Sequence, residues 1–137
     1  MAKPLRLKLL TPYQAVFDGQ VEAVIVPGEV GELGVLAGHT KFVTTLVPGI
    51  VRFVAEGRTR HAAVSGGFCE VSAEGVTVLA DSLEMPEEID VERAERARRS
   101  AEEALKKRAQ LDEQEIRHQQ ARLARALNRL RAAKLAG

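Results

Sequence analysis

The first part of the chain alternates apolar and polar residues at the spacing of short strands. In the segment Leu5-Arg6-Leu7-Lys8-Leu9 the leucines fall on one side and the charged residues on the other, which predicts a strand with one buried face. Similar segments recur between turn signals such as Asp18-Gly19 and Pro48-Gly49. The predicted strands are residues 5–9, 21–26, 42–47, 50–54, 59–64, 68–72 and 76–80. Short, closely spaced strands without helical patterns between them predict an antiparallel sandwich or barrel.

After Pro86 the pattern becomes helical. Residues 87–137 contain no proline and a single, terminal glycine, whereas residues 1–86 hold all five prolines and the other ten glycines. Asp90 is placed to cap a first helix, and Asp112, followed by Glu115, is placed to cap a second. The predicted apolar stripes are Val91, Ala94, Ala97, Ala101, Ala104 and Leu105, then Ile116, Leu123, Leu127 and Leu130. We therefore expect a segregated α+β protein: an N-terminal antiparallel β-sandwich (residues 1–86) followed by a C-terminal two-helix antiparallel hairpin (residues 87–137).

Neither glycine nor proline marks a turn between the two predicted helices. The same residues are therefore compatible with a hairpin or with one extended rod of about 45 residues, about 68 Å long. Alanine faces bury little area, so the two forms are expected to differ by only a few kcal/mol, which a ligand or partner can reverse. A permanently folded hairpin remains the alternative.

Charge is unevenly distributed in the helical part. Residues 87–116 carry ten acidic and seven basic side chains, whereas residues 117–137 carry six basic and no acidic ones. Such a basic end either complements the dipole of its own helix or binds an acidic partner. A nucleic-acid-binding module that uses residues 117–137 is therefore an alternative function, although an aromatic content of 4% argues against stacking on single strands.

No catalytic or metal-binding constellation emerges from the sequence. The glycines of residues 28–34 are spaced GxxGxxG, which fits a structural turn better than a phosphate-binding loop. Cys69 is expected to be a small buried side chain, and the three histidines lack ligand spacing. No run of 18 apolar residues and no apolar leader is present, so we expect neither membrane insertion nor export. An enzyme in its own right, with a catalytic cofactor, is not expected.

Several motifs, in order along the whole chain, carry a family resemblance. They are Thr11-Pro12, residues 16–22 (VFDGQVE), residues 31–39 (GELGVLAGH), residues 48–52 (PGIVR), residues 65–68 (SGGF), residues 78–81 (VLAD) and residues 126–130 (ALNRL). In this combination the sequence resembles the ε subunit of bacterial F-type ATP synthase. The resemblance implies a non-catalytic rotor subunit of the central stalk, peripheral at the cytoplasmic face of the cell membrane. It couples proton flow to ATP synthesis and inhibits ATP hydrolysis through movement of its C-terminal helices.

The resemblance also implies partners. The sandwich is expected to bind the γ subunit and the membrane c-ring, with Glu32 near the ring and His39 near γ. The basic helix end, including Arg117, Arg122 and Arg131, is expected to face acidic segments of the catalytic β subunits when the helices are extended. The resemblance implies neither binding to nucleic acid nor direct insertion into the membrane.

Finally, the resemblance implies a regulatory ATP site in some family members. Its motif stands here as residues 89–94 (IDVERA), with Asp90 and Arg93 as ligands. Glu84 precedes the motif, and Arg125 and Arg129 on the second helix complete the set. A further arginine of the pattern is replaced by Ser100, and Arg99 is displaced by about 100° around the helix. The competing interpretation is that Asp90 only caps the helix and Arg93 only makes a surface ion pair.

Overall fold

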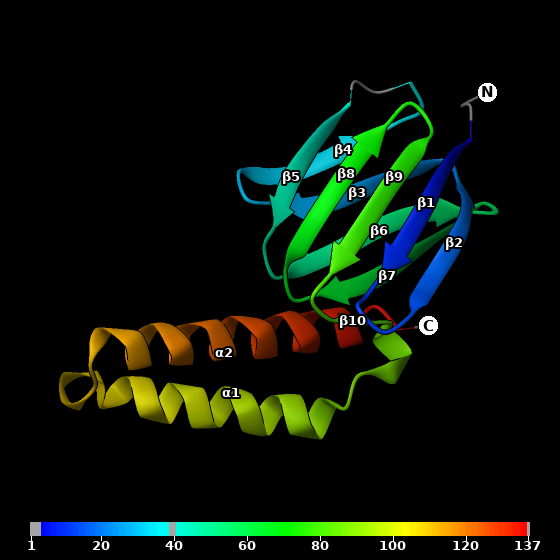
Figure 1. Cartoon of the computed structure of the whole chain (residues 1–137). Helices are drawn as coiled ribbons and strands as arrows, with labels where there is room; N and C mark the ends of the chain where they lie inside the picture. The colour runs from blue at the N-terminus through cyan, green and yellow to red at the C-terminus, as the bar shows by residue number, and fades with distance from the viewer. Residues whose placement is uncertain (1–3, 39–40, 137) are drawn as a thin grey trace. The chain divides into compact units, whose positions relative to one another are not determined.

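The computed structural model describes residues 4–38 and 41–136. The chain divides into two compact units, one ending at Met85 and the other beginning at Pro86. The described strands lie in the first unit, and the helices lie in the second (Figure 1). The expected fold class, a β-sandwich followed by two helices, is confirmed.

Ten described strands form the first unit. They are β1 (Leu5–Leu10), β2 (Ala15–Val21), β3 (Ala23–Gly28), β4 (Gly31–Val35), β5 (Phe42–Leu46), β6 (Gly49–Ala55), β7 (Arg58–Val64), β8 (Gly67–Ser72), β9 (Gly75–Ala80) and β10 (Leu83–Glu84). Their order is β10-β7-β6-β3-β5-β8-β9-β1-β2, with β4 paired to β3. The paired strands described are antiparallel, except that β1 runs parallel to β9.

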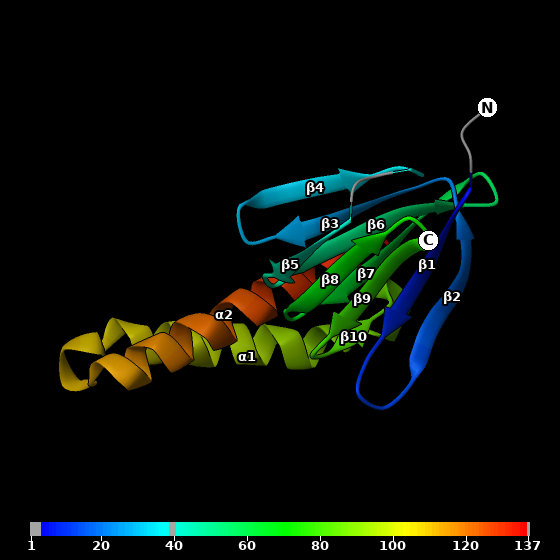
Figure 2. The same cartoon turned by 45° about the horizontal axis from the view of Figure 1, so that its top comes forward.

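The strands form two layers around one core. One layer contains β5, β8, β9, β1 and β2, and the other contains β4, β3, β6, β7 and β10 (Figures 1 and 2). The single pair Gly28–Leu46 joins β3 to β5 and so connects the layers. As the alternation predicts, Leu7 and Leu9 are fully buried while Arg6 and Lys8 are exposed. The same alternation brings Val51, Phe53, Cys69, Val71 and Val78 into the core.

Three described strands were missed by the predicted pattern: β2, β4 and the two-residue β10. Asp18-Gly19 is not a turn but lies within β2, where Asp18 pairs with Lys8 and Gly19 with Leu7. An ion pair stabilises this edge, because Arg6 Nε donates to Asp18 Oδ1 over 2.9 Å. Likewise, only the centre of residues 28–34 is a turn: Gly31–Val35 form β4 against β3.

The second unit consists of two helices and two short 3-10 turns. They are η1 (Pro86–Glu88), α1 (Val91–Lys106), η2 (Arg108–Gln110) and α2 (Glu113–Ala133). Both predicted caps are confirmed: Asp90 Oδ1 accepts from Arg93 N over 3.0 Å, and Asp112 Oδ1 accepts from Glu115 N over 2.8 Å. The chain reverses at η2, so α1 and α2 lie side by side as an antiparallel hairpin (Figure 1).

Alanine dominates the seam between the two helices. Ala94 and Ala101 of α1 and Ala126 of α2 are each at most 3% exposed. The predicted leucine face of α2 is wrong at Leu127, which is 45% exposed. Ala126 and Leu127 both lie three or four residues from Leu123 and Leu130, so spacing alone does not choose between them, and in the structure Ala126 is the buried one. A small side chain at this position lets the two backbones approach closely.

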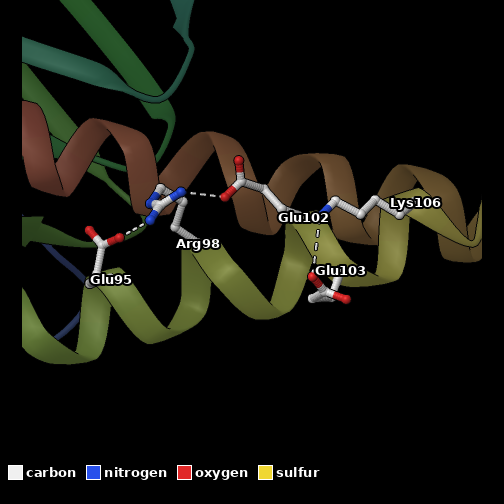
Figure 3. A network of polar contacts seen from close by, with 5 residues as sticks. All are labelled: Glu95, Arg98, Glu102, Glu103 and Lys106. Atoms are coloured by element: carbon white, nitrogen blue, oxygen red, sulfur yellow. Dashed lines mark hydrogen bonds and ion pairs between the residues drawn. The ribbon is translucent and has the colours of Figure 1, made fainter.

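Three of the four acidic residues of α1 are paired with bases of the same helix. Arg98 bonds to both Glu95 and Glu102, and Lys106 Nζ lies 3.3 Å from Glu103 Oε1 (Figure 3). Pairs of this spacing stabilise a helix by about 0.2–0.5 kcal/mol each. They neutralise these carboxylates locally, within a helix that carries four acidic and five basic side chains. Among the helices described, none has the length and apolar content needed to cross a bilayer.

Candidate functional site

One side of the helical hairpin collects the arginines proposed from the sequence. Arg122 Nη1 of α2 donates to Ser100 Oγ of α1 over 3.0 Å, which fixes the register of the two antiparallel helices. Seven residues make about two turns, so Arg93 lies two turns before Ser100 on the same side of α1. By the same argument Arg129 lies two turns beyond Arg122 on α2. The antiparallel arrangement therefore places Arg93 and Arg129 toward the same end of the hairpin, and Arg125 lies between Arg122 and Arg129 on their side of α2.

Asp90 and Arg93 are joined through the helix end rather than through their side chains. Both residues are exposed, and Asp90 uses Oδ1 to accept from the backbone N–H of Arg93. This confirms the capping role of Asp90 while leaving the guanidinium of Arg93 at the surface. The positive end of the α1 dipole lies at the same place, which favours a negatively charged group there.

Ser100 stands where the resemblance predicts a further arginine. The guanidinium of Arg122 reaches Ser100 from the neighbouring helix. Sequence reasoning placed Arg122 among the partner contacts and did not foresee this bond. The available signal was the spacing of Arg122 and Arg129. They are seven residues, or about two turns, apart and therefore lie on the same side of α2.

Glu84 belongs to the other unit of the chain. It lies in β10 and pairs in register with Ala63 of β7, and its residue is half-buried. It is therefore held by the sandwich.

The other residues expected to contact partners are spread over both units. Glu32 is exposed in β4 and pairs with Pro27 near the tip of the β3–β4 hairpin, next to Val30, which is 99% exposed. His39 lies outside the described residues. Arg117 Nη1 is 3.9 Å from Glu113 Oε2, and Arg131 Nη2 donates to Asn128 Oδ1 over 2.8 Å. These contacts are intrahelical, so both cations remain on the surface of α2.

An exposed apolar row on the sandwich was not foreseen. Phe68 of β8 and Leu79 of β9 are directly paired and are 56% and 46% exposed. Thr45 and Leu10 continue the row on the flanking strands β5 and β1. Consecutive apolar residues at 68–69 and 78–80 were the available signal, since a strand with one wet face should not contain them. Exposed apolar surface of this kind marks an interaction site more often than chance placement does.

Burial or an ion pair accounts for the pKa shifts that are resolved among the described side chains. Burial raises the pKa of the Cys69 thiol to about 11, which keeps it protonated and unreactive at neutral pH. The hydrogen bond from Arg6 lowers the pKa of Asp18, as expected for an exposed ion pair. In the described part of the chain no group of three His, Cys, Asp or Glu side chains is arranged to hold a metal ion.

Comparison with known proteins covers both units. Residues 4–86 match the family ATP synthase, Delta/Epsilon chain, beta-sandwich domain, and residues 87–134 match ATP synthase, Delta/Epsilon chain, long alpha-helix domain. The ATP synthase epsilon chain of Bacillus velezensis is 44% identical over 128 residues, which are 93% of this chain and 96% of that one. The epsilon chain of Nitratidesulfovibrio vulgaris is 46% identical over 132 residues, or 96% of each chain.

Solved structures give the same result. A chain of the Euglena gracilis mitochondrial ATP synthase, in its OSCP/F1/c-ring assembly, superposes with a TM-score of 0.75 at 28% identity, covering 97% of this chain and 82% of that one. A chain of the Tetrahymena thermophila central stalk and c-ring shares the fold, with a TM-score of 0.62 at 15% identity and coverage of 96% and 98%. The sequence motifs, the two-unit fold and these matches agree. The chain belongs to the ATP synthase delta/epsilon-chain family, as an epsilon subunit of the bacterial F-type enzyme and a non-catalytic component of its central stalk.

Proposed function

We propose that the chain is a rotor subunit that couples proton flow to ATP synthesis and restrains ATP hydrolysis. In this proposal the sandwich, residues 1–86, binds the γ subunit and the c-ring and turns with them. The helices, residues 87–137, leave their closed hairpin and extend toward the catalytic β subunits to block hydrolysis. The complex holds the subunit at the cytoplasmic face of the cell membrane. The observation that carries the proposal is the alanine seam, which makes opening of the hairpin inexpensive.

The apolar row on the sandwich supports the contact with γ. Phe68 and Leu79 together offer an exposed apolar surface on a rigid sheet, and such surface gains free energy when a partner covers it. Glu32 supports the contact with the c-ring, because the β3–β4 hairpin projects a carboxylate beside the fully exposed Val30. The two surfaces lie on different strands, so both partners can bind at once.

The seam between α1 and α2 supports movement of the helices. Apolar burial contributes roughly 25 cal/mol per Å², and an alanine side chain offers only one methyl group. Ala94, Ala101 and Ala126 are thus well buried but contribute little each. A partner that binds the open form more tightly by a few kcal/mol is sufficient to shift the equilibrium.

The charge of α2 supports an acidic partner in the open state. Residues 117–134 contain six basic and no acidic side chains, whereas three of the four acids of α1 are paired within α1. Acidic side chains on the catalytic β subunits would give the basic side chains of α2 the kind of ionic partner that α1 finds within its own helix. Arg117, Arg122 and Arg131 are the proposed contacts.

Truncation tests whether the sandwich alone binds the stalk and whether the helices are needed to inhibit hydrolysis. The natural cut is after Met85 rather than after Asp81, because β10 pairs with β7 and both Leu83 and Met85 pack against the sandwich core. A chain of residues 1–85 should still join the stalk of a reconstituted ATP synthase, which should then hydrolyse ATP faster than the complex with the full chain. Unchanged inhibition by the truncated chain would overturn the role of the helices.

We further propose that the arginine side of the hairpin binds ATP and holds the helices closed. Guanidinium groups bind phosphate oxygens bidentately, and Arg93, Arg125 and Arg129 lie on one side of the hairpin near the positive end of α1. Ser100 with Arg122 extends the same side. Bound ATP would connect α1 to α2 and oppose their separation, with Asp90 as an additional ligand.

Calorimetry tests the ATP site directly. Titration of the full chain with ATP should release heat, and Arg93→Ala should abolish it. Arg99→Ala is the matched control, because Arg99 is also exposed on α1 but lies about 240° around the helix from Arg93. Absence of heat with the unmodified chain, or equal loss in both variants, would reject the site and leave the helices under the control of partners alone.

A further inference from the structure

The row of α2 that starts at Ile116 and faces α1 contains one polar residue. Counting in steps of three and four from Ile116, the residues in step are Gln119, Leu123, Ala126, Leu130 and Ala133, and each is buried or half-buried. Gln119 is thus the only polar member of this set. It lies in the second turn of α2, close to the reversal at η2.

The amide of Gln119 is only half satisfied. Its Nε2 donates to Glu115 Oε1 over 3.0 Å, while its Oε1 is buried and finds no hydrogen-bond partner among the described residues. The amide cannot be reversed to relieve this, because the carbonyl oxygen would then face the Glu115 carboxylate. The orientation is therefore determined by the contact with Glu115.

Among the described residues, no donor of the opposite helix bonds this oxygen. Because Arg122 of α2 bonds Ser100 of α1, Gln119, about one turn before Arg122, lies beside the last turns of α1. The seam residues in those turns are Ala101, Ala104 and Leu105, all apolar. A buried, unpaired group of this kind destabilises the state that buries it.

We propose that Gln119 is a built-in weak point of the closed hairpin, from which α1 and α2 begin to separate. When the helices part, Oε1 gains water as its hydrogen-bond partner, so the desolvation cost is recovered in the open form alone. A single polar residue in an apolar helix seam lowers the stability of the pair in the same way. The inference rests on the proposed function in one respect: the separation of α1 from α2 is taken as the inhibitory movement.

Hydrogen exchange of the isolated full chain tests the weak point without reference to inhibition. Gln119→Met keeps a side chain of similar length and high helix propensity but removes the unpaired carbonyl. Backbone amides of residues 113–123 should then exchange about tenfold more slowly. Gln120→Met is the matched control, because Gln120 is exposed on the neighbouring position, and it should leave exchange unchanged.

A second variant tests the opposite direction. Gln119→Glu places another carboxylate beside Glu115 and should speed exchange of the same amides at neutral pH. Exchange that is unchanged or faster in Gln119→Met would overturn the inference, as would equal slowing in Gln120→Met.

ATP hydrolysis by the reconstituted complex separates this inference from the proposed function. Slower exchange together with weaker inhibition in Gln119→Met supports both. Slower exchange with unchanged inhibition supports the weak point but contradicts opening as the inhibitory movement. Unchanged exchange overturns the weak point, while loss of inhibition on truncation after Met85 would still support the role of the helices.

Discussion

Gly67 illustrates how closely the backbones of neighbouring strands approach in the sandwich. Its φ is +126°, and a Cβ added there would lie 2.1 Å from the carbonyl oxygen of Leu79. Gly31 has the same φ of +126°, but a Cβ there would meet nothing within 4 Å. The two glycines therefore separate the cost of a left-handed backbone from the cost of a clash with a neighbouring strand.

We expect Gly31→Ala to lower the free energy of unfolding by about 1–2 kcal/mol, the usual cost of a positive φ. Gly67→Ala should lower it by a further 1–3 kcal/mol or so, because the strand β9 must also shift. Urea unfolding of the two variants provides the measurement. Equal losses would show that β8 and β9 have more freedom at this point than the structure allows.

The buried thiol of Cys69 makes the stability of the sandwich depend on pH. Its folded-state pKa of about 11 lies above that of an exposed thiol, which is about 8.5. The thiol therefore contributes stability that is fully present below about pH 8.5 and is lost as pH rises toward about 11. Unfolding measured at pH 8 and pH 10 should reveal this slope, and Cys69→Ala should reduce it. A thiol reagent should also fail to label the folded chain at pH 8.

At the scale of elements, the two helix starts depend on their caps. Asp112→Ala removes the side-chain acceptor for Glu115 N and should destabilise α2 by about 1 kcal/mol. Asp112→Ser retains a capping oxygen and should recover most of that loss. Circular dichroism during thermal unfolding can compare the three chains. If both variants behaved alike, the first turn of α2 would owe its order to something other than its cap.

The strands β2 and β4 show where local pattern fails to define an element. Asp18 and Gly19 are typical turn residues, yet β2 continues through them because Arg6 supplies an ion pair from β1. Gly31 and Gly34 are weak strand formers, yet β4 pairs with β3 along Gly31–Val35. In both cases cross-strand partners outweigh local propensity, as is common in sheets.

At the scale of the whole molecule, the two units differ in what holds them together. The sandwich buries Phe53, Leu7, Leu9 and many valines in one core, whereas the hairpin buries mainly alanine. Amides of β8 and β9 should therefore exchange with solvent more slowly than those of α1 and α2, by one or more orders of magnitude. Hydrogen exchange of the intact chain provides the test. Equal protection of both units would contradict a helical part that opens at low cost.

The sequence alone determined the class of the fold and the two helix caps. Alternation in residues 5–9 and the absence of proline after Pro86 are local signals, and local signals act before any tertiary contact forms. The motifs spread along the chain likewise predicted the family, whereas Arg93, Arg125 and Arg129 as ATP ligands stay a prediction. The sequence could not predict which residues of α2 form the seam. Ala126 and Leu127 are adjacent, and only packing against α1 determines which of them is buried.

Only the tertiary structure decided which distant side chains meet. The bond between Ser100 and Arg122 joins residues 22 apart, and it depends on a helix register that no single helix contains. The apolar row of Phe68 and Leu79 arises because β8 and β9 pair in one register and present the same face. The unpaired oxygen of Gln119 likewise exists only when α1 closes over it. Each of these features is a relation between elements, whereas periodicity along the chain describes one element at a time.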